Sequence, residues 1–302
     1  MGNPVSDFGP FHLATCGACP SCRYVLPPLG LISAKYFANG SVSCERCGAN
    51  VDAWEAAREV AQRRGVSAFG LQALGANRTT FIFPLAPGET KELDLTQYGV
   101  PEDATVLSMN YTPNGHGCLP LEVHGNTPRR RLVGTKVYIY GRPLEGGAGP
   151  VPIAISATWA GHGETTESWF YLVDAMEAMA TRRFWHAILP AHSAVEVAMM
   201  PLVRDGLERH LPRQRAQDFT RGLRYSSALN VVLPLLCKLA AVPPLSEPIR
   251  EELNRLRELR NRVVHKGTNE SSVEEKMAAE LLCAAVFGFE YVRYARPLLL
   301  GT

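Results

Sequence analysis

Five of the eight cysteines in this chain lie between residues 16 and 47. They form two clusters, Cys16-Gly17-Ala18-Cys19-Pro20-Ser21-Cys22 and Cys44-Glu45-Arg46-Cys47-Gly48. A Cys-x-x-Cys turn lets two sulfur atoms approach one metal ion, and two such turns supply the four ligands of a tetrahedral site. The cysteine spacing therefore predicts that this segment folds around a metal.

Two Cys-x-x-Cys pairs separated by a short segment have the spacing of a zinc ribbon. We predict one structural Zn²⁺ held by Cys19, Cys22, Cys44 and Cys47. Cys16 is an alternative ligand, because Cys16 and Cys19 have the same spacing as Cys19 and Cys22. Four thiolates close the coordination sphere, so this metal is expected to have no part in catalysis. A redox dithiol would also explain one Cys-x-x-Cys pair, but it would not need the second.

The rest of the composition is that of a folded, soluble protein, with 46% hydrophobic and 20% charged residues. The longest apolar run, residues 228–242, is interrupted by Asn230, Pro234 and Lys238 and is too short to span a bilayer. The first residues lack the basic flank and apolar core of a secretory signal. We therefore predict a cytoplasmic protein with no membrane partner.

Three regions differ in their residue patterns, and together they predict a multidomain α+β protein. Residues 1–65 hold the cysteine pairs and a short helix over residues 51–64. Residues 78–160 contain short β-prone segments, at 79–83, 104–109, 132–140 and 151–159, separated by Gly- and Pro-rich turns. About six strands in this region predict a β-sandwich-like domain or small barrel. We expect it to recognise a ligand that its sequence does not name.

Residues 167–300 show apolar residues at helical spacing and predict an all-α bundle of five helices. The first is expected to run to Pro190, which breaks it, and the second over residues 191–211. The third is expected over 218–239, the fourth over 246–266, and the fifth from Ser271 or Ser272 to about Arg296. Residues 201–266 hold 13 Lys and Arg against 7 Asp and Glu. This local excess of positive charge could attract a phosphate backbone, although a solvated helical surface would look the same.

The fourth predicted helix ends in Arg260-Asn261-Arg262-Val263-Val264-His265-Lys266, followed by Gly267 as the expected stop. Histidine can exchange a proton near neutral pH, and arginine offers a permanently charged, planar fork for phosphate oxygens. Asn261 lies four residues before His265, on the same face of the helix. Arg and His at this end also complement the helix dipole, which is a purely structural alternative.

This motif resembles that of the HEPN ribonuclease family, in which Arg and His, often with Asn after the Arg, lie near the end of a late helix in a small bundle. The resemblance covers residues 167–300. The segment from His192 to Met199 is similar to the family's early helix, where an acidic residue lies among apolar neighbours. Glu196 is therefore predicted to orient Arg260 or to lie at a dimer interface; an ordinary exposed helix residue is the alternative. Gly267 stands where related toxins often carry a modified Tyr, so that modification is not expected.

The resemblance implies an endoribonuclease that needs no metal for catalysis and leaves a 2′,3′-cyclic phosphate on RNA. Its catalytic residues would be Arg260, Asn261, His265 and Glu196, and the pattern assigns no role to Arg257 or Arg262. A five-residue separation places Arg260 and His265 about 140° apart around a helix. The resemblance implies that a homodimer solves this problem by joining two motifs in one composite cleft.

The family is frequent among toxins and antiviral defence effectors, so this is the expected setting. The zinc ribbon and β-domain would then recognise a phage or cellular trigger. The alternative is a non-catalytic module that binds nucleic acid or protein and whose helical domain only dimerises.

Overall fold

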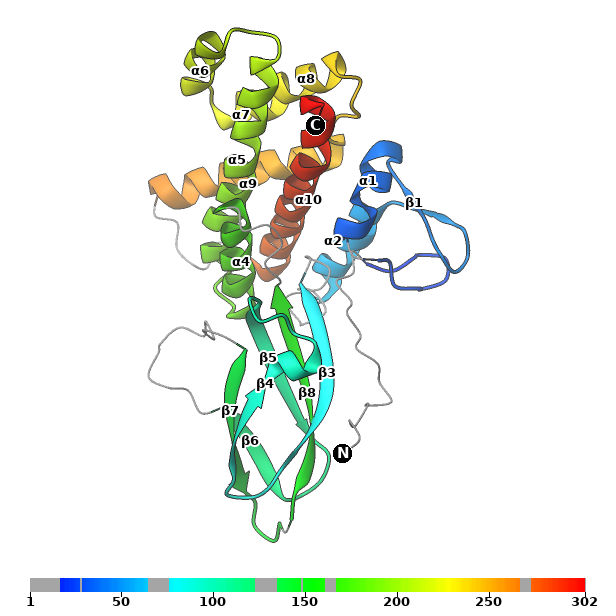
Figure 1. Ribbon diagram of the computed structural model, residues 1–302, viewed down its shortest axis with the longest axis vertical. Helices are drawn as coiled ribbons and strands as arrows, with labels where there is room; N and C mark the ends of the chain where they lie inside the picture. Colours follow the sequence, from blue (N-terminus) through cyan, green and yellow to red (C-terminus); the bar gives the residue numbers. More distant parts are fainter. Residues whose placement is uncertain are drawn as a thin grey trace. The chain divides into compact units, whose positions relative to one another are not determined.

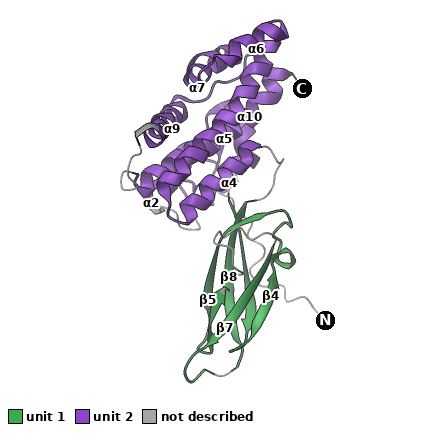
Figure 2. Ribbon diagram, turned by 90° about the vertical axis from the view of Figure 1, so that its left-hand side faces the viewer, with its two compact units in different colours: residues 1–13, 76–163 green, residues 14–75, 164–302 purple. Residues whose placement is uncertain are grey.

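The computed structural model describes residues 17–27, 29–64, 76–122, 135–147, 149–160, 167–266 and 273–301. It contains both helices and strands, with the helical region at the C-terminal end and the cysteine cluster near the N-terminus. The chain divides into two compact units (Figure 2). One unit includes residues 76–160, and the other combines residues 17–64 with residues 167–301.

The first unit is built from two three-stranded antiparallel sheets, ordered β3-β8-β5 and β4-β7-β6 (Figure 1). Apolar side chains from both sheets form one core, which includes Phe81, Ile139 and Ile155. At one end of this core the indole N–H of Trp159 donates to Thr79 Oγ1 at 3.0 Å. The strands are β3 (Asn77–Leu85), β4 (Thr90–Asp94), β5 (Thr105–Pro113), β6 (Cys118–Glu122), β7 (Lys136–Pro143) and β8 (Val151–Ala160), with a 3-10 turn at Leu95–Tyr98.

The second unit is a helical bundle in which α5 packs against both α4 and α10. By length and composition alone, α5 is the one described helix that could cross a membrane, and 50% of its most apolar stretch is buried inside this unit. Helix α10 is buried around most of its circumference, including every residue from Ala278 to Val292. The helices of this region are α4 (Glu167–Ala180), α5 (Phe184–Glu208), α6 (Arg213–Arg221), α7 (Tyr225–Ser227), α8 (Leu233–Leu239), α9 (Glu247–Lys266) and α10 (Glu275–Leu300), with a π-helical turn at Ala228–Val232.

The first two helix boundaries differ from the sequence prediction. The break lies at residues 181–183, where Arg182 has a φ of 59°, and α5 continues through both Pro190 and Pro201. A proline inside a helix removes one backbone hydrogen bond. Burial of ten residues along α5 outweighs that loss, because the helix is held by its neighbours rather than by its own propensity.

The third predicted helix, residues 218–239, is divided in the structure. Helix α6 ends at Arg221, and the chain becomes helical again at Tyr225. A π-helical turn then precedes Pro234, with the N–H of Leu233 bonded to the carbonyl of Ala228, five residues earlier. A π-turn is a common way to fit a proline into a helical path. The fourth helix confirms the prediction almost to the residue.

The N-terminal segment contains a helix that the sequence analysis did not predict, α1 (Leu29–Asn39), between the two cysteine pairs. It is followed by a short antiparallel pair, β1 (Val42–Ser43) and β2 (Asn50–Val51), and by the predicted short helix, α2 (Ala53–Arg64). Asp52 caps α2 by accepting from the N–H of Trp54 at 2.9 Å, and it also accepts from the Tyr36 hydroxyl at 3.0 Å. One carboxylate therefore joins α1 to the start of α2.

The same segment packs directly on α10. Tyr36 and Trp54 both make edge-to-face ring contacts with Phe287, at centroid distances of 5.7 and 5.3 Å. Phe37 makes a similar contact with Tyr291 at 5.2 Å. Trp54, Phe287 and Tyr291 are nearly inaccessible to solvent. The cysteine-bearing segment and the helical region, which the sequence analysis describes as separate, therefore share one apolar core.

Candidate functional site

The two Cys-x-x-Cys pairs lie on hairpin turns of the same design. Ala18 and Val25 bridge the first turn, and β1 pairs with β2 around the second. In each turn the residue after the second cysteine has a positive φ, 61° at Arg23 and 71° at Gly48. Its N–H bonds the carbonyl of the first cysteine, at 2.9 Å and 2.8 Å respectively. This conformation closes each turn and holds its two sulfur atoms near each other.

The four predicted ligands are brought together. The Sγ atoms of Cys19, Cys22, Cys44 and Cys47 all lie within 4.8 Å of one another. Between the turns, Cys19 Sγ is 3.7 Å from Cys47 Sγ, and Cys22 Sγ is 3.6 Å from Cys44 Sγ. Four sulfurs each about 2.3 Å from a tetrahedral zinc ion would be about 3.8 Å apart. The cluster therefore has the dimensions of a four-sulfur metal site, while Cys16 lies outside the described residues.

Backbone donors and crowding affect the thiols of the first turn in opposite directions. The N–H of Cys22 bonds the sulfur of Cys19 and lowers the pKa of that thiol from 9.0 to about 6. The N–H of Tyr24 acts in the same way on Cys22, but burial and the neighbouring thiols raise the pKa of Cys22 to about 12. Without a bound cation, the Cys19 thiol therefore loses its proton readily, whereas the Cys22 thiol keeps its proton. A bound metal would relieve the repulsion between the two thiolates.

The predicted catalytic residues lie at the C-terminal end of α9. Arg260 is half-buried, and its Nη1 donates to Asn261 Oδ1 at 3.1 Å. Asn261 and the next residue, Arg262, are exposed. The backbone of α9 continues through His265, whose side chain lies outside the described residues. The structure thus brings Arg260 and Asn261 together at an accessible helix end.

Glu196 lies on α5 and faces a histidine. Its Oε2 is 3.5 Å from Nδ1 of His192, one turn earlier on the same helix, and its side chain is 39% exposed. In the described chain no hydrogen bond or ion pair joins Glu196 to Arg260, which is the partner that the sequence analysis expected. Glu196 instead lies beside His192, whose buried ring is close enough to Arg260 to be affected by its charge.

His192 is the centre of a polar cluster that the sequence analysis missed. We call His192 on α5, Tyr225 on α7, and Arg257 and Arg260 on α9 the His192 cluster. The rings of His192 and Tyr225 lie 4.7 Å apart, and both side chains are buried. Burial lowers the pKa of His192 from 6.5 to about 4, with a further contribution from the positive charges of Arg260 and Arg257. The imidazole is therefore neutral at pH 7.

Several polar atoms of this cluster are buried without a hydrogen-bond partner in the part of the chain that the structure describes. They are both ring nitrogens of His192, the hydroxyl of Tyr225, and the Nε atoms of Arg257 and Arg260. Arg257 Nη2 has a partner, Glu258 on the same helix, at 3.4 Å. The available sequence signal was the presence of His192 and Glu196 one helical turn apart in an otherwise apolar helical stretch, where titratable residues are uncommon.

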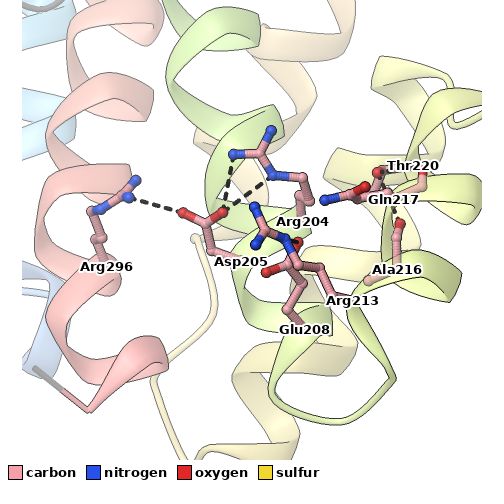
Figure 3. A network of polar contacts seen from close by, with 8 residues as sticks. All are labelled: Arg204, Asp205, Glu208, Arg213, Ala216, Gln217, Thr220 and Arg296. Atoms are coloured by element: carbon pink, nitrogen blue, oxygen red, sulfur yellow. Dashed lines mark hydrogen bonds and ion pairs between the residues drawn. The ribbon is translucent and has the colours of Figure 1, made fainter.

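A second polar network lies at the C-terminal end of α5 (Figure 3). Asp205 pairs with Arg204 on its own helix at 3.2 Å and with Arg296 on α10 at 2.9 Å. Glu208 lies 3.9 Å from Arg213 at the start of α6. The arginine side chains are between 46% and 81% exposed, so each pair contributes about 1 kcal/mol at most. We regard this network as a connection between helix ends.

A comparison of the chain with protein-family models, curated proteins and solved structures finds no match.

Proposed function

We propose that the protein is a metal-independent endoribonuclease of the HEPN type, with Arg260, Asn261 and His265 at its active site. The observation that carries this proposal is the placement of Arg260. Arg260 is half-buried beside Asn261, which is exposed, and no carboxylate pairs with its guanidinium among the described residues. An arginine in this position is free to bind a phosphate group through its planar fork.

In the proposed reaction the 2′-oxygen of RNA attacks the adjacent phosphorus and the bond from phosphorus to the 5′-oxygen breaks. The products are a 2′,3′-cyclic phosphate and a 5′-hydroxyl. One proton leaves the 2′-hydroxyl and one is delivered to the 5′-oxygen, a pair of transfers suited to histidine. Arg260 would stabilise the additional negative charge on phosphorus in the transition state. Glu196 would act on this site indirectly, through His192.

Two accessory features belong to the same proposal. Zinc would occupy the cluster of Cys19, Cys22, Cys44 and Cys47 as a structural ion, because four thiolates leave no position for substrate. A homodimer would join two copies of the α9 motif, since about 140° separates Arg260 from His265 on one helix. A strictly monomeric protein at micromolar concentration that retained activity would contradict the composite site; sedimentation velocity measures this directly.

The reaction can be tested with the zinc-loaded full chain and a fluorescently labelled RNA, in the presence of EDTA. His265→Ala should slow cleavage by a factor on the order of a hundred to ten thousand. Arg260→Ala should be comparably slow, and Arg260→Lys should recover only part of the rate, because lysine keeps the charge but lacks the planar fork.

Arg262→Ala is the matched control, since Arg262 is exposed on the same helix. Arg257 does not serve as a second control, because it belongs to the His192 cluster. If Arg262→Ala abolishes cleavage while the Arg260 and His265 variants remain active, the assignment of the site is wrong. If the wild type binds RNA but does not cut it, the chain acts as a binding module of the toxin or defence system to which the resemblance points.

A further inference from the structure

The His192 cluster gathers hydrogen-bond donors from three helices in one place. His192 is 3% exposed and Tyr225 is 6% exposed, so both side chains are almost completely removed from water. Their rings are in contact, and α5 packs against α9, which contributes Arg257 and Arg260. The donors therefore come from three segments, each more than 30 residues from the next along the chain, an arrangement that only tertiary packing produces.

The rest of the described protein does not provide acceptors for several donors of this cluster. The Tyr225 hydroxyl and the Nε atoms of Arg257 and Arg260 are buried and without hydrogen-bond partners. A buried donor without a partner destabilises the fold, because it has lost its hydrogen bonds to water. Three such donors in one cluster indicate a place where a ligand with several acceptor atoms completes the hydrogen bonding.

The charge of the cluster selects the kind of ligand. Arg257 and Arg260 carry two positive charges, His192 is neutral at pH 7, and Glu196 contributes the one nearby carboxylate. Glu196 is bonded to neither arginine in the described chain, so it does not neutralise the donors directly. An excess of guanidinium and hydroxyl donors over acceptors fits a phosphate group, whose oxygens only accept. The Arg257 side chain is 27% exposed, so this member of the cluster is in contact with solvent.

We propose that His192, Tyr225, Arg257 and Arg260 form a phosphate-binding subsite, which takes a backbone phosphate of RNA. The identity of the ligand as RNA rests on the proposed function, whereas the binding of a phosphate group does not. Arg260 would be shared with the reacting phosphate, and Arg257, one helical turn earlier, would hold a neighbouring phosphate of the same strand. Tyr225 and His192 would supply neutral donors beneath the two guanidinium groups.

The subsite can be tested by binding measurements that need no cleavage. Inorganic phosphate is titrated into the zinc-loaded full chain by isothermal calorimetry, and a 2′-O-methyl RNA oligonucleotide, which cannot be cut, is titrated by fluorescence anisotropy. Tyr225→Phe removes one hydroxyl and keeps the ring, so it should weaken the binding of both ligands roughly threefold to tenfold. Arg257→Gln should weaken both on the order of tenfold or more, because a charged hydrogen bond is lost.

Two controls are matched to these variants. Tyr171→Phe removes a hydroxyl that is exposed and bonded to Glu167, and Arg262→Ala removes an exposed charge from α9. Both should bind phosphate as the wild type does. If Tyr225→Phe and Arg257→Gln also bind phosphate like the wild type, the subsite is refuted. Tyr225→Phe is close in shape to the native residue, so it decides the question even if Arg257→Gln fails to fold.

The two titrations distinguish a failure of the phosphate subsite from a failure of the proposed nuclease function. If phosphate competes with the oligonucleotide for the wild type, and if Tyr225→Phe binds phosphate more weakly, an RNA phosphate is supported as the ligand. Phosphate binding that depends on Tyr225 but does not compete with the oligonucleotide overturns the assignment to RNA. Loss of cleavage in Arg260→Ala together with unchanged phosphate binding in Tyr225→Phe leaves the nuclease proposal standing and refutes the subsite.

Discussion

The buried imidazole of His192 should make the protein less stable in mild acid. Its pKa is lowered from 6.5 to about 4, first by burial and then by Arg260 and Arg257. Because the folded-state pKa lies below the unfolded one, the unfolded chain binds a proton between these values and the folded chain does not. Linkage then requires that the contribution of neutral His192 to the free energy of unfolding is fully present above pH 6.5. This contribution decreases as the pH falls and is lost below about pH 4.

The size of the effect follows from the same shift. A difference of about 2.5 pKa units corresponds to roughly 3 kcal/mol when the whole range is crossed. Between pH 8 and pH 5 the expected loss from this one group is about 2 kcal/mol, because at pH 5 most of the unfolded chain is protonated at His192. The side chain is only 4% exposed, so solvent screening reduces this figure little.

The assay is urea unfolding at pH 8 and pH 5, in buffers free of phosphate, for the wild type and for His192→Phe. The phenyl ring keeps the contact with Tyr225 but cannot take up a proton. Zinc binding also depends on pH, and the comparison of the two proteins removes this common contribution. We expect the loss of stability in acid to be about 2 kcal/mol smaller in His192→Phe.

Exposed His186 provides the matched control, since His186→Gln should show the same acid sensitivity as the wild type. An equal loss of stability in the wild type and in His192→Phe would refute the reasoning. An independent check is the NMR titration of the His192 ring, whose midpoint should lie near pH 4; a midpoint near 6.5 would show that the imidazole is not buried as described.

Three further predictions concern the architecture of the helical unit. Protein purified without chelators should contain one zinc per chain, and Cys44→Ser should lower both zinc content and thermal stability, since metal binding contributes to folding; zinc-free, fully stable wild type would contradict this. Glu280→Ala should destabilise the chain by roughly 1–3 kcal/mol in urea unfolding, because buried Glu280 accepts from Gln62 at 2.9 Å and pairs with arginines of α2 and α9; an unchanged unfolding midpoint would contradict that role. Gly288→Val should lower the free energy of unfolding by about 1–3 kcal/mol through overpacking, because an added Cβ would already lie 3.0 Å from Leu253. At Gly30 an added Cβ meets no atom within 4 Å, so Gly30→Ala should be neutral or stabilising by up to about 1 kcal/mol.

The sequence determined the features that depend on local residue patterns. The spacing of the cysteines predicted that Cys19, Cys22, Cys44 and Cys47 come together, because a Cys-x-x-Cys turn is a local structure. Helical periodicity, an N-terminal cap region and a following glycine predicted α9 within a residue of its observed bounds, Glu247–Lys266. Arg260 and Asn261 were placed correctly on that helix because they are neighbours in the chain.

Local patterns were less successful where tertiary packing opposes them. Pro190 signals a helix end, yet α5 passes through it, because burial against α4 and α10 stabilises the helix on both sides of the proline. The uninterrupted burial of α10 has a counterpart in its sequence, since residues 278–292 are apolar around most of the helix. That pattern implies that something covers α10, but it does not identify the cysteine-bearing segment as the cover.

Only the tertiary structure decided which distant residues meet. Gln62 bonds Glu280 across 218 residues of chain, and this contact joins the helix beside the cysteine cluster to the core of the bundle. Tyr225 and Arg257 had no signal of their own, and they became candidates only when α5, α7 and α9 brought them beside His192. The physical reason is that other segments of the chain create the environment that buries a side chain. The pKa shifts and the unpaired donors both follow from that burial.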